Sequence, residues 1–187
     1  ETEAEPFRPV LTTNFKEGVS FATFTPDNKL VYAITNLGRD KSALVLMDPA
    51  TCEELEQLYT NDKYDLGGLW YSDAQKKLLG VSYEGHKGKT RYFFDKATEE
   101  MLGRMERHLR GYEIGIGGSN KAEDKYIVYA GGDRTMGAYY FYDVKSDTMT
   151  KLADLAPWID EQQMAEMTPV TYTSRDGLEI EGYLTLP

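Results

Sequence analysis

Short runs in which apolar and polar residues alternate cover most of this chain, and clusters of glycine, proline, asparagine or aspartate separate them. Alternation with a period of two places every second side chain on one face of an extended strand. Runs of this length, bounded by turn-forming residues, are typical of a protein made of short strands. The pattern therefore predicts an all-β fold without a long helix.

The strand pattern repeats three times along the chain, and two independent marks recur in phase. The first mark is an apolar run that starts every 48 residues: Leu30–Ala33, Leu78–Val81 and Tyr126–Tyr129. The second mark is an aspartate followed three residues later by threonine or serine, found at Asp48, Asp95 and Asp143. Such an aspartate can accept hydrogen bonds from backbone N–H groups and close a turn. Marks that recur at this period indicate a repeat architecture.

Each repeat contains four predicted strands. In the first repeat they span residues 19–24, 30–35, 43–47 and 54–59; in the second, 66–71, 78–83, 91–94 and 101–105; in the third, 113–118, 126–130, 138–142 and 148–152. Four short strands in about 40–50 residues are typical of one blade of a β-propeller. The sequence thus predicts a partial β-propeller of three four-stranded blades, which occupy about residues 19–62, 63–109 and 110–153.

Three blades are too few for a closed ring, because propellers have about four to eight. The open flanks would carry unpaired edges that attract further strands. We therefore expect blades from a longer parent protein ahead of this chain, or edge-to-edge self-association of the chain itself. Residues 1–18 are expected to be a preceding strand or a linker.

The sequence changes in character after the third repeat. Residues 154–168 contain few strand-forming residues and have Pro157 at a suitable first helical position, which predicts a short helical connector. Residues 169–187 form two alternating runs around Asp176-Gly177. This pattern predicts a β-hairpin, because glycine tolerates the positive φ of the turn. A lone hairpin is marginally stable in water, so we expect this one to belong to a further domain.

The hairpin sequence, PVTYTSRDGLEIEGYLTLP, resembles the junction between the propeller and the catalytic domain in the prolyl oligopeptidase family of serine peptidases. The resemblance is closer to the acylaminoacyl peptidase and dipeptidyl aminopeptidase branch of that family. The matching positions are Ser174, Arg175, Asp176, Gly177, Leu178, Ile180, Gly182, Tyr183, Leu184, Leu186 and Pro187. The resemblance implies that the chain holds the last three blades and the first hairpin of an α/β-hydrolase domain, whose remainder would lie beyond Pro187.

The resemblance does not extend to catalytic residues. The Gly-x-Ser-x-Gly motif that presents the nucleophile of α/β-hydrolases does not occur in this sequence, and neither does a His-Gly-Gly oxyanion loop. No residue of the chain is therefore a catalytic candidate, and only the parent protein would be an enzyme. The partners that the resemblance implies are the hydrolase domain of the same parent chain and, in that parent, a peptide substrate.

Composition excludes some classes of partner. The formal net charge of -10 argues against nucleic acid, because binding to phosphates needs a basic surface. No apolar run approaches the roughly 20 residues that a membrane span requires, so no membrane partner is expected. The single cysteine, Cys52, cannot form an internal disulfide and does not fix the compartment. A soluble protein of either the cytoplasm or the periplasm fits the sequence.

No cofactor or metal site is predicted. The segment Gly85–Thr90 lacks the first glycine of a phosphate-binding loop, since Tyr83 stands at that position. The glycine-rich segment Gly111–Gly118 has no βαβ pattern around it, as a dinucleotide site would need. The two histidines, His86 and His108, do not have the spacing of zinc ligands. We expect each histidine to be an exposed loop residue.

The loops between the second and third strands each carry a positive charge in this acidic chain. Because blades share one topology, these loops lie on the same face of a propeller. Our hypothesis is that their basic residues face the hydrolase domain or acidic groups of a peptide substrate: Arg39, Lys87, Lys89 and Arg134. The alternative is that they are ordinary polar loop tips.

The sequence favours a non-catalytic propeller that limits the access of short peptides to an α/β-hydrolase domain by steric exclusion. The alternative is a TolB-type propeller that serves as a protein-binding scaffold. The blades are compatible with both functions. The final hairpin favours the first, because a pure scaffold does not need to end in that sequence.

Overall fold

The computed structural model describes residues 8–86 and 88–186. The chain falls into two units: one runs as far as Glu84 and includes Thr90–Phe94, and the other consists of Gly85–Lys89 and of the chain from Asp95 onward. Of the segment 1–18, which was expected to be a strand or a linker, residues 1–7 lie outside the described residues, and residues 8–18 contain no strand.

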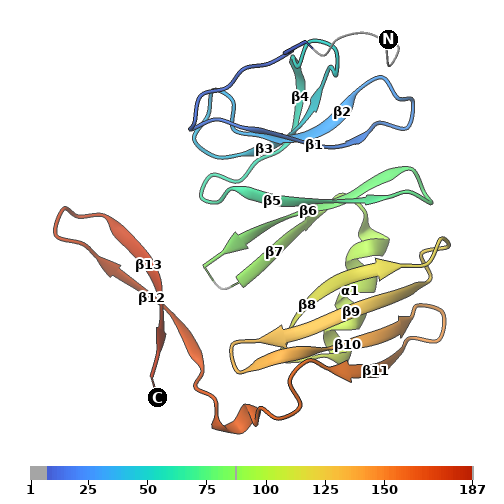
Figure 1. Ribbon diagram of the computed structural model, residues 1–187, viewed down its shortest axis with the longest axis vertical. Helices are drawn as coiled ribbons and strands as arrows, with labels where there is room; N and C mark the ends of the chain where they lie inside the picture. Colours follow the sequence, from blue (N-terminus) through green and yellow to red (C-terminus); the bar gives the residue numbers. More distant parts are fainter. Residues whose placement is uncertain (1–7, 87, 187) are drawn as a thin grey trace. The chain divides into compact units, whose positions relative to one another are not determined.

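The first unit contains two antiparallel sheets (Figure 1). Four strands pair in sequence order in the first sheet: β1 Val19–Phe24, β2 Val31–Thr35, β3 Ala43–Met47 and β4 Glu54–Tyr59. Three strands pair in sequence order in the second sheet: β5 Leu66–Ser72, β6 Lys77–Gly85 and β7 Gly88–Phe93. Antiparallel sheets built from consecutive strands are the arrangement of propeller blades, as the repeat predicted.

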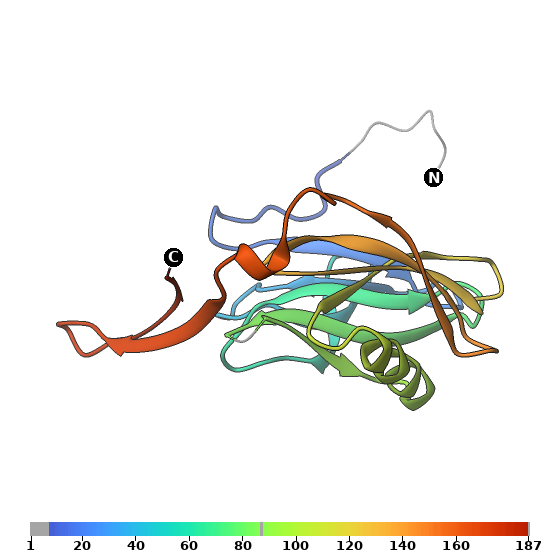
Figure 2. The ribbon, with the colours of Figure 1, turned by 90° about the horizontal axis from the view of Figure 1, so that it is seen from below.

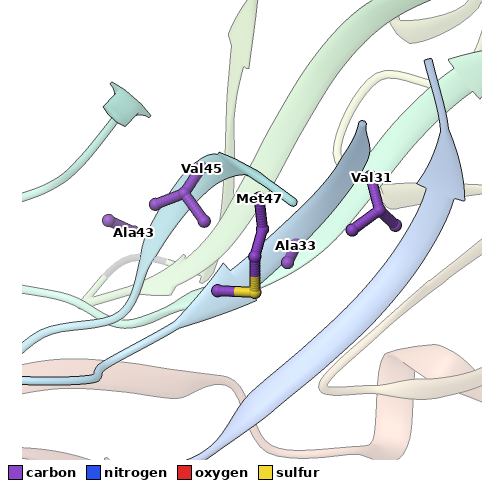
Figure 3. Close-up of a cluster of buried hydrophobic side chains, with 5 residues drawn as sticks. All are labelled: Val31, Ala33, Ala43, Val45 and Met47. Atoms are coloured by element: carbon purple, nitrogen blue, oxygen red, sulfur yellow. The ribbon is translucent and has the colours of Figure 1, made fainter. Parts of the chain in front are cut away.

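The first sheet is buried on both faces because apolar residues occupy nearly every position of its two central strands. Val31 of β2 pairs with Met47 of β3, so the two side chains share a face. The buried cluster on that face has five members, each at most 4% exposed: Val31, Ala33, Ala43, Val45 and Met47 (Figure 3). On the opposite face, Leu44 packs with Leu66 and Val81 of the second sheet. The core of the unit therefore lies on both faces of β2 and β3.

Residues from three neighbouring segments pack against the buried cluster: Val19 of β1, Leu37 of the loop between β2 and β3, and Cys52 of the turn between β3 and β4. Arg39, from the β2–β3 loop, forms an ion pair with Glu54 and donates to Gln57 Oε1 at 3.2 Å. Both acceptors lie on β4 and pair across the sheet with members of the cluster. Two β1 side chains remain about half exposed: Phe21 and Phe24.

The second unit contains a four-stranded sheet, a helix and a separate two-stranded ribbon (Figures 1 and 2). The strands of the sheet, which pair in sequence order, are β8 Glu113–Ser119, β9 Lys125–Gly132, β10 Thr135–Asp143 and β11 Thr148–Asp154. The other elements are α1 Lys96–His108, the 3₁₀ helix η1 Glu161–Gln163, and the ribbon strands β12 Met167–Thr173 and β13 Glu179–Thr185. The sheet is the third predicted blade, with every bound within three residues of its expected position.

Backbone geometry confirms the repeat. The loop before the second strand of each blade contains a non-glycine residue with φ between 52° and 57°, spaced 48 and then 47 residues apart: Asn28, Lys76 and Glu123. A second pair of positive-φ residues follows the repeated aspartate by four positions, at Cys52 and Asp147. Left-handed backbone is uncommon outside glycine, so its recurrence in phase shows that the same turns are built each time.

The fourth strand predicted for the second blade, residues 101–105, is wrong because these residues lie in α1. The cause is Asp95, whose carboxylate accepts from Thr98 N at 2.9 Å and caps the helix. Asp48 and Asp143 instead accept from backbone N–H groups two and three residues further on and close turns. The same sequence mark thus begins a turn or a helix. Apolar spacing favours the helix here, with four buried positions: Thr98, Met101, Leu102 and Met105.

The helical connector predicted over residues 154–168 is confirmed only as a single turn. Glu161–Gln163 alone is helical, as one 3₁₀ turn capped by the side chain of Asp160. Met167 already belongs to β12, and Pro169 lies within that strand. Proline lacks a backbone N–H, and a strand with one free edge tolerates that loss. The hairpin itself is confirmed, with Asp176-Gly177 in its turn and Gly177 at φ 87°.

Candidate functional site

The β12–β13 ribbon has one polar and one apolar face. Its register pairs Thr171 with Glu181 and Pro169 with Tyr183, so these residues share a face. The alternate positions form the other face, whose main apolar side chains are Val170, Tyr172, Ile180 and Leu184. Tyr172 is 58% exposed and Leu184 is 46% exposed. An accessible apolar face of this kind is suited to packing against another layer of structure.

The polar face of the ribbon contacts the loop between β6 and β7 through His86. Its ring stacks on Tyr183, with centroids 6.1 Å apart and planes at 26°. Its Nδ1 lies 3.5 Å from Glu181 Oε2, and its Nε2 lies 3.5 Å from Thr171 Oγ1. The Tyr183 hydroxyl also donates to the His86 carbonyl oxygen at 3.0 Å. The expectation of an exposed loop histidine is therefore wrong, and this side chain is only 19% exposed.

A second blade loop contacts the start of the ribbon. Asp133, in the turn between β9 and β10, accepts a hydrogen bond from the backbone N–H of Met167, with 2.5 Å between Oδ2 and N. The segment before the ribbon is held too, because the Tyr112 hydroxyl donates to Glu161 Oε2 at 2.9 Å. That acceptor is the main reason that the pKa of Tyr112 is raised. The ribbon is thus attached to two blade loops and preceded by an anchored turn.

The four basic residues that were expected to face a hydrolase domain or a peptide have different surroundings in the structure. Arg39 is held by Glu54 and Gln57 in the first unit. Lys89 and Arg134 are exposed, and neither side chain forms a hydrogen bond or ion pair with any residue that the structure describes. Lys87 lies outside the described residues. The side chains that reach the ribbon belong to their neighbours, so a role for the basic residues in docking or substrate binding stays a hypothesis.

Helix α1 is joined to the third blade by a small polar cluster. The buried Tyr142 hydroxyl of β10 donates to Asp147 Oδ1 at 2.6 Å, and His108 Nε2 lies 3.2 Å from the same oxygen. The hydroxyl is the leading cause that lowers the pKa of Asp147, and His108 adds to the effect. Arg104, one turn before His108, also bonds to the Tyr142 hydroxyl. Two helix residues thus converge on one β10–β11 corner.

This cluster predicts a pH response. Because the folded-state pKa of Asp147 is lowered, its stabilising contribution is present above the unfolded value of about 3.8 and is lost as pH falls through the folded value. Replacing Tyr142 with phenylalanine removes the donor, so the pKa of Asp147 is expected to rise and the helix contact to fail at a higher pH. An NMR titration of the Asp147 carboxyl carbon measures the shift. Tyr126→Phe, the same change at another buried tyrosine, should leave it unchanged; an unaltered titration in Tyr142→Phe would contradict the assignment.

The residues that the structure describes form neither a cluster of metal ligands nor a helix that could cross a membrane. Among them, no three histidine, cysteine, aspartate or glutamate side chains gather so that they could hold a metal ion. Within the same ranges, α1 and η1 are too short or too polar to cross a bilayer.

The architecture defines the class of fold: propeller-type blades of consecutive antiparallel strands, followed by an amphipathic two-stranded ribbon. Solved structures show which proteins share it. Prolyl oligopeptidase B from Galerina marginata matches 94% of this chain with a TM-score of 0.59 and 17% sequence identity. A prolyl endopeptidase structure matches 97% of the chain with a TM-score of 0.60 and 14% identity. Dipeptidyl peptidase 4 from Porphyromonas gingivalis matches 88% with a TM-score of 0.51 and 13% identity.

These matches confirm, for the fold, the resemblance seen in the hairpin sequence. The fold of the chain is similar to one part of a prolyl oligopeptidase. It spans about a quarter of the length of the structures it matches, with 24%, 26% and 23% of those chains covered. No family model matches the chain, and no curated protein matches it by sequence.

Proposed function

We propose that this chain is a non-catalytic part of a serine peptidase, in which the blades limit the access of peptides to an α/β-hydrolase domain. The likeness of the fold to prolyl oligopeptidases and a dipeptidyl peptidase supports this proposal. The observation that carries it is the amphipathic ribbon. Its polar face contacts blade loops, and its apolar face presents Tyr172 and Leu184. A ribbon with these two faces is suited to join a propeller to a second, tightly packed domain.

The proposed role in selection is steric. Blades over an active site exclude folded proteins and admit short peptides, so specificity comes from exclusion as well as from contacts. The hydrolase domain would supply the nucleophile, the base and the oxyanion hole. Within this proposal, the domain that follows the ribbon packs on Val170, Tyr172, Ile180 and Leu184.

The test compares this chain with a longer product of the same gene that includes the segment after Pro187. We expect the longer product to cleave short chromogenic peptides and to lose that activity on treatment with a serine-reactive inhibitor. The 187-residue chain should show no cleavage under the same conditions, because it lacks the Gly-x-Ser-x-Gly motif.

Substrate length provides the second arm of this test. A version of the longer product that begins at residue 154, and so lacks the blades, should cleave long and short peptides at similar rates. The intact product should prefer the short ones. Equal preference in both versions would contradict the steric role. A longer product without hydrolase activity that instead binds a protein partner would support the scaffold function.

A further inference from the structure

From these contacts we infer that the β6–β7 loop and the β9–β10 turn form a two-point latch that sets the orientation of the β12–β13 ribbon. His86 and Asp133 are its positioning residues. All of these contacts lie within this chain. Their effect on the orientation of a following domain rests on the proposed function. The latch consists of the contacts that these two residues make with the ribbon.

The first point of the latch is a set of contacts around one side chain. His86 meets Thr171 of β12 and both Glu181 and Tyr183 of β13. All three ribbon residues lie on the same face, as the register requires. The Tyr183 hydroxyl adds a 3.0 Å hydrogen bond to the His86 carbonyl oxygen. Side-chain and backbone contacts therefore hold the same loop residue, which restrains both rotation and translation of the ribbon.

The second point fixes the end of the ribbon. Asp133 accepts from the backbone N–H of Met167, the first residue of β12. A hydrogen bond from an N–H to a charged carboxylate is stronger than one between neutral groups. Because the donor is the backbone, this contact defines where the strand begins rather than how one side chain lies.

The two points hold the ribbon at its open end and near its middle. Met167 pairs with Thr185 at the open end, whereas Thr171 pairs with Glu181 near the middle, and the turn at Ser174–Leu178 lies at the other end. A two-stranded ribbon is marginally stable by itself, so these contacts determine both its order and its direction. Release of the latch would free the ribbon to pivot about the segment before β12. Whatever follows β13 would then move with it.

Hydrogen exchange of the 187-residue chain tests the latch. The β12–β13 amides exchange through local opening, whose free energy includes the latch contacts. Loss of one hydrogen bond of about 1 kcal/mol corresponds to about a five-fold change. We expect His86→Ala and Asp133→Ala each to raise ribbon exchange about five-fold, and the double variant to raise it about 25-fold. Exchange in β9 and β10 should stay unchanged. Asp133→Asn keeps an acceptor and should restore most of the protection.

Two further variants keep the test decisive. Lys89→Ala changes an exposed residue beside the same loop and should leave ribbon exchange at the wild-type rate. Tyr183→Phe removes only the hydroxyl that donates to the loop, so it tests the first point even where an alanine variant disturbs the blades. Unchanged ribbon exchange in both Tyr183→Phe and the double variant would overturn the latch. That result would leave the proposed function standing, because the latter depends on activity of the longer product.

Discussion

Replacing Gly137 with alanine is expected to lower the free energy of unfolding by about 2–6 kcal/mol. The residue lies at φ 85°, where a side chain is strained at a cost of about 1–3 kcal/mol. A Cβ there would stand 2.5 Å from the Ala130 carbonyl oxygen and 2.7 Å from the Tyr129 ring. Overpacking against fixed backbone costs about 1–3 kcal/mol more. The β9–β10 hairpin must therefore distort, since the oxygen that blocks the methyl group belongs to the partner strand.

A neighbouring glycine provides the control for this prediction. Gly132 lies in the same hairpin and has no positive φ, and a methyl group added at its Cα would meet no other atom within 4 Å. Gly132→Ala should change stability by less than about 0.5 kcal/mol, as surface substitutions usually do. Denaturant unfolding followed by circular dichroism gives both values. Equal midpoints for the two variants would show that the crowding at Gly137 does not exist in solution.

The blades could be predicted from the sequence because their signals are local and repeated. The alternation of apolar and polar residues predicted the bounds of the confirmed blade strands to within a few residues, and the aspartates at Asp48 and Asp143 marked turns. The positive-φ residues Asn28, Lys76 and Glu123 show why the repeat holds in structure: each blade needs the same left-handed turn before its second strand. Such signals act within about four residues, so they depend little on the rest of the fold.

The helix was missed because one local signal has two structural outcomes. An aspartate that accepts from N–H groups two or three residues ahead stabilises a turn or the first turn of a helix equally well. The deciding signals lay further along the chain. Glu99 stands in the first turn, Arg107 and His108 stand in the last, and Gly111 follows at φ 88°. These are ordinary helix signals. The prediction followed the repeat of four strands per blade instead.

The latch could not be predicted because its partners are distant in sequence. His86 meets residues 85 and 97 positions away, and Asp133 meets one 34 positions away. The basic residues Lys87, Lys89 and Arg134 drew attention to the two loops of the latch, whereas Arg39 drew attention to a loop of the first unit. Charge alone, however, does not distinguish a loop tip in solvent from one that contacts another element. The side chains that contact the ribbon, His86 and Asp133, are the neighbours of two of those basic residues.

The second large prediction concerns helix α1. Met105 is 0% exposed in α1, and its truncation to alanine is expected to lower the free energy of unfolding by about 2–5 kcal/mol. The loss combines the transfer free energy of the missing atoms with the cavity they leave. Met136→Ala makes the identical chemical change at a methionine that is 58% exposed. That control should cost less than about 0.5 kcal/mol.

Unfolding curves for Met105→Ala and Leu102→Ala separate a helix from a strand at this position. In a helix, Met101, Leu102 and Met105 share one buried face. In a strand over residues 101–105, Leu102 would point away from the other two. Leu102→Ala therefore completes the test: α1 requires a loss comparable to that of Met105→Ala. A large effect at Met101 and Met105 with none at Leu102 would restore the fourth strand and remove the helix from the second unit.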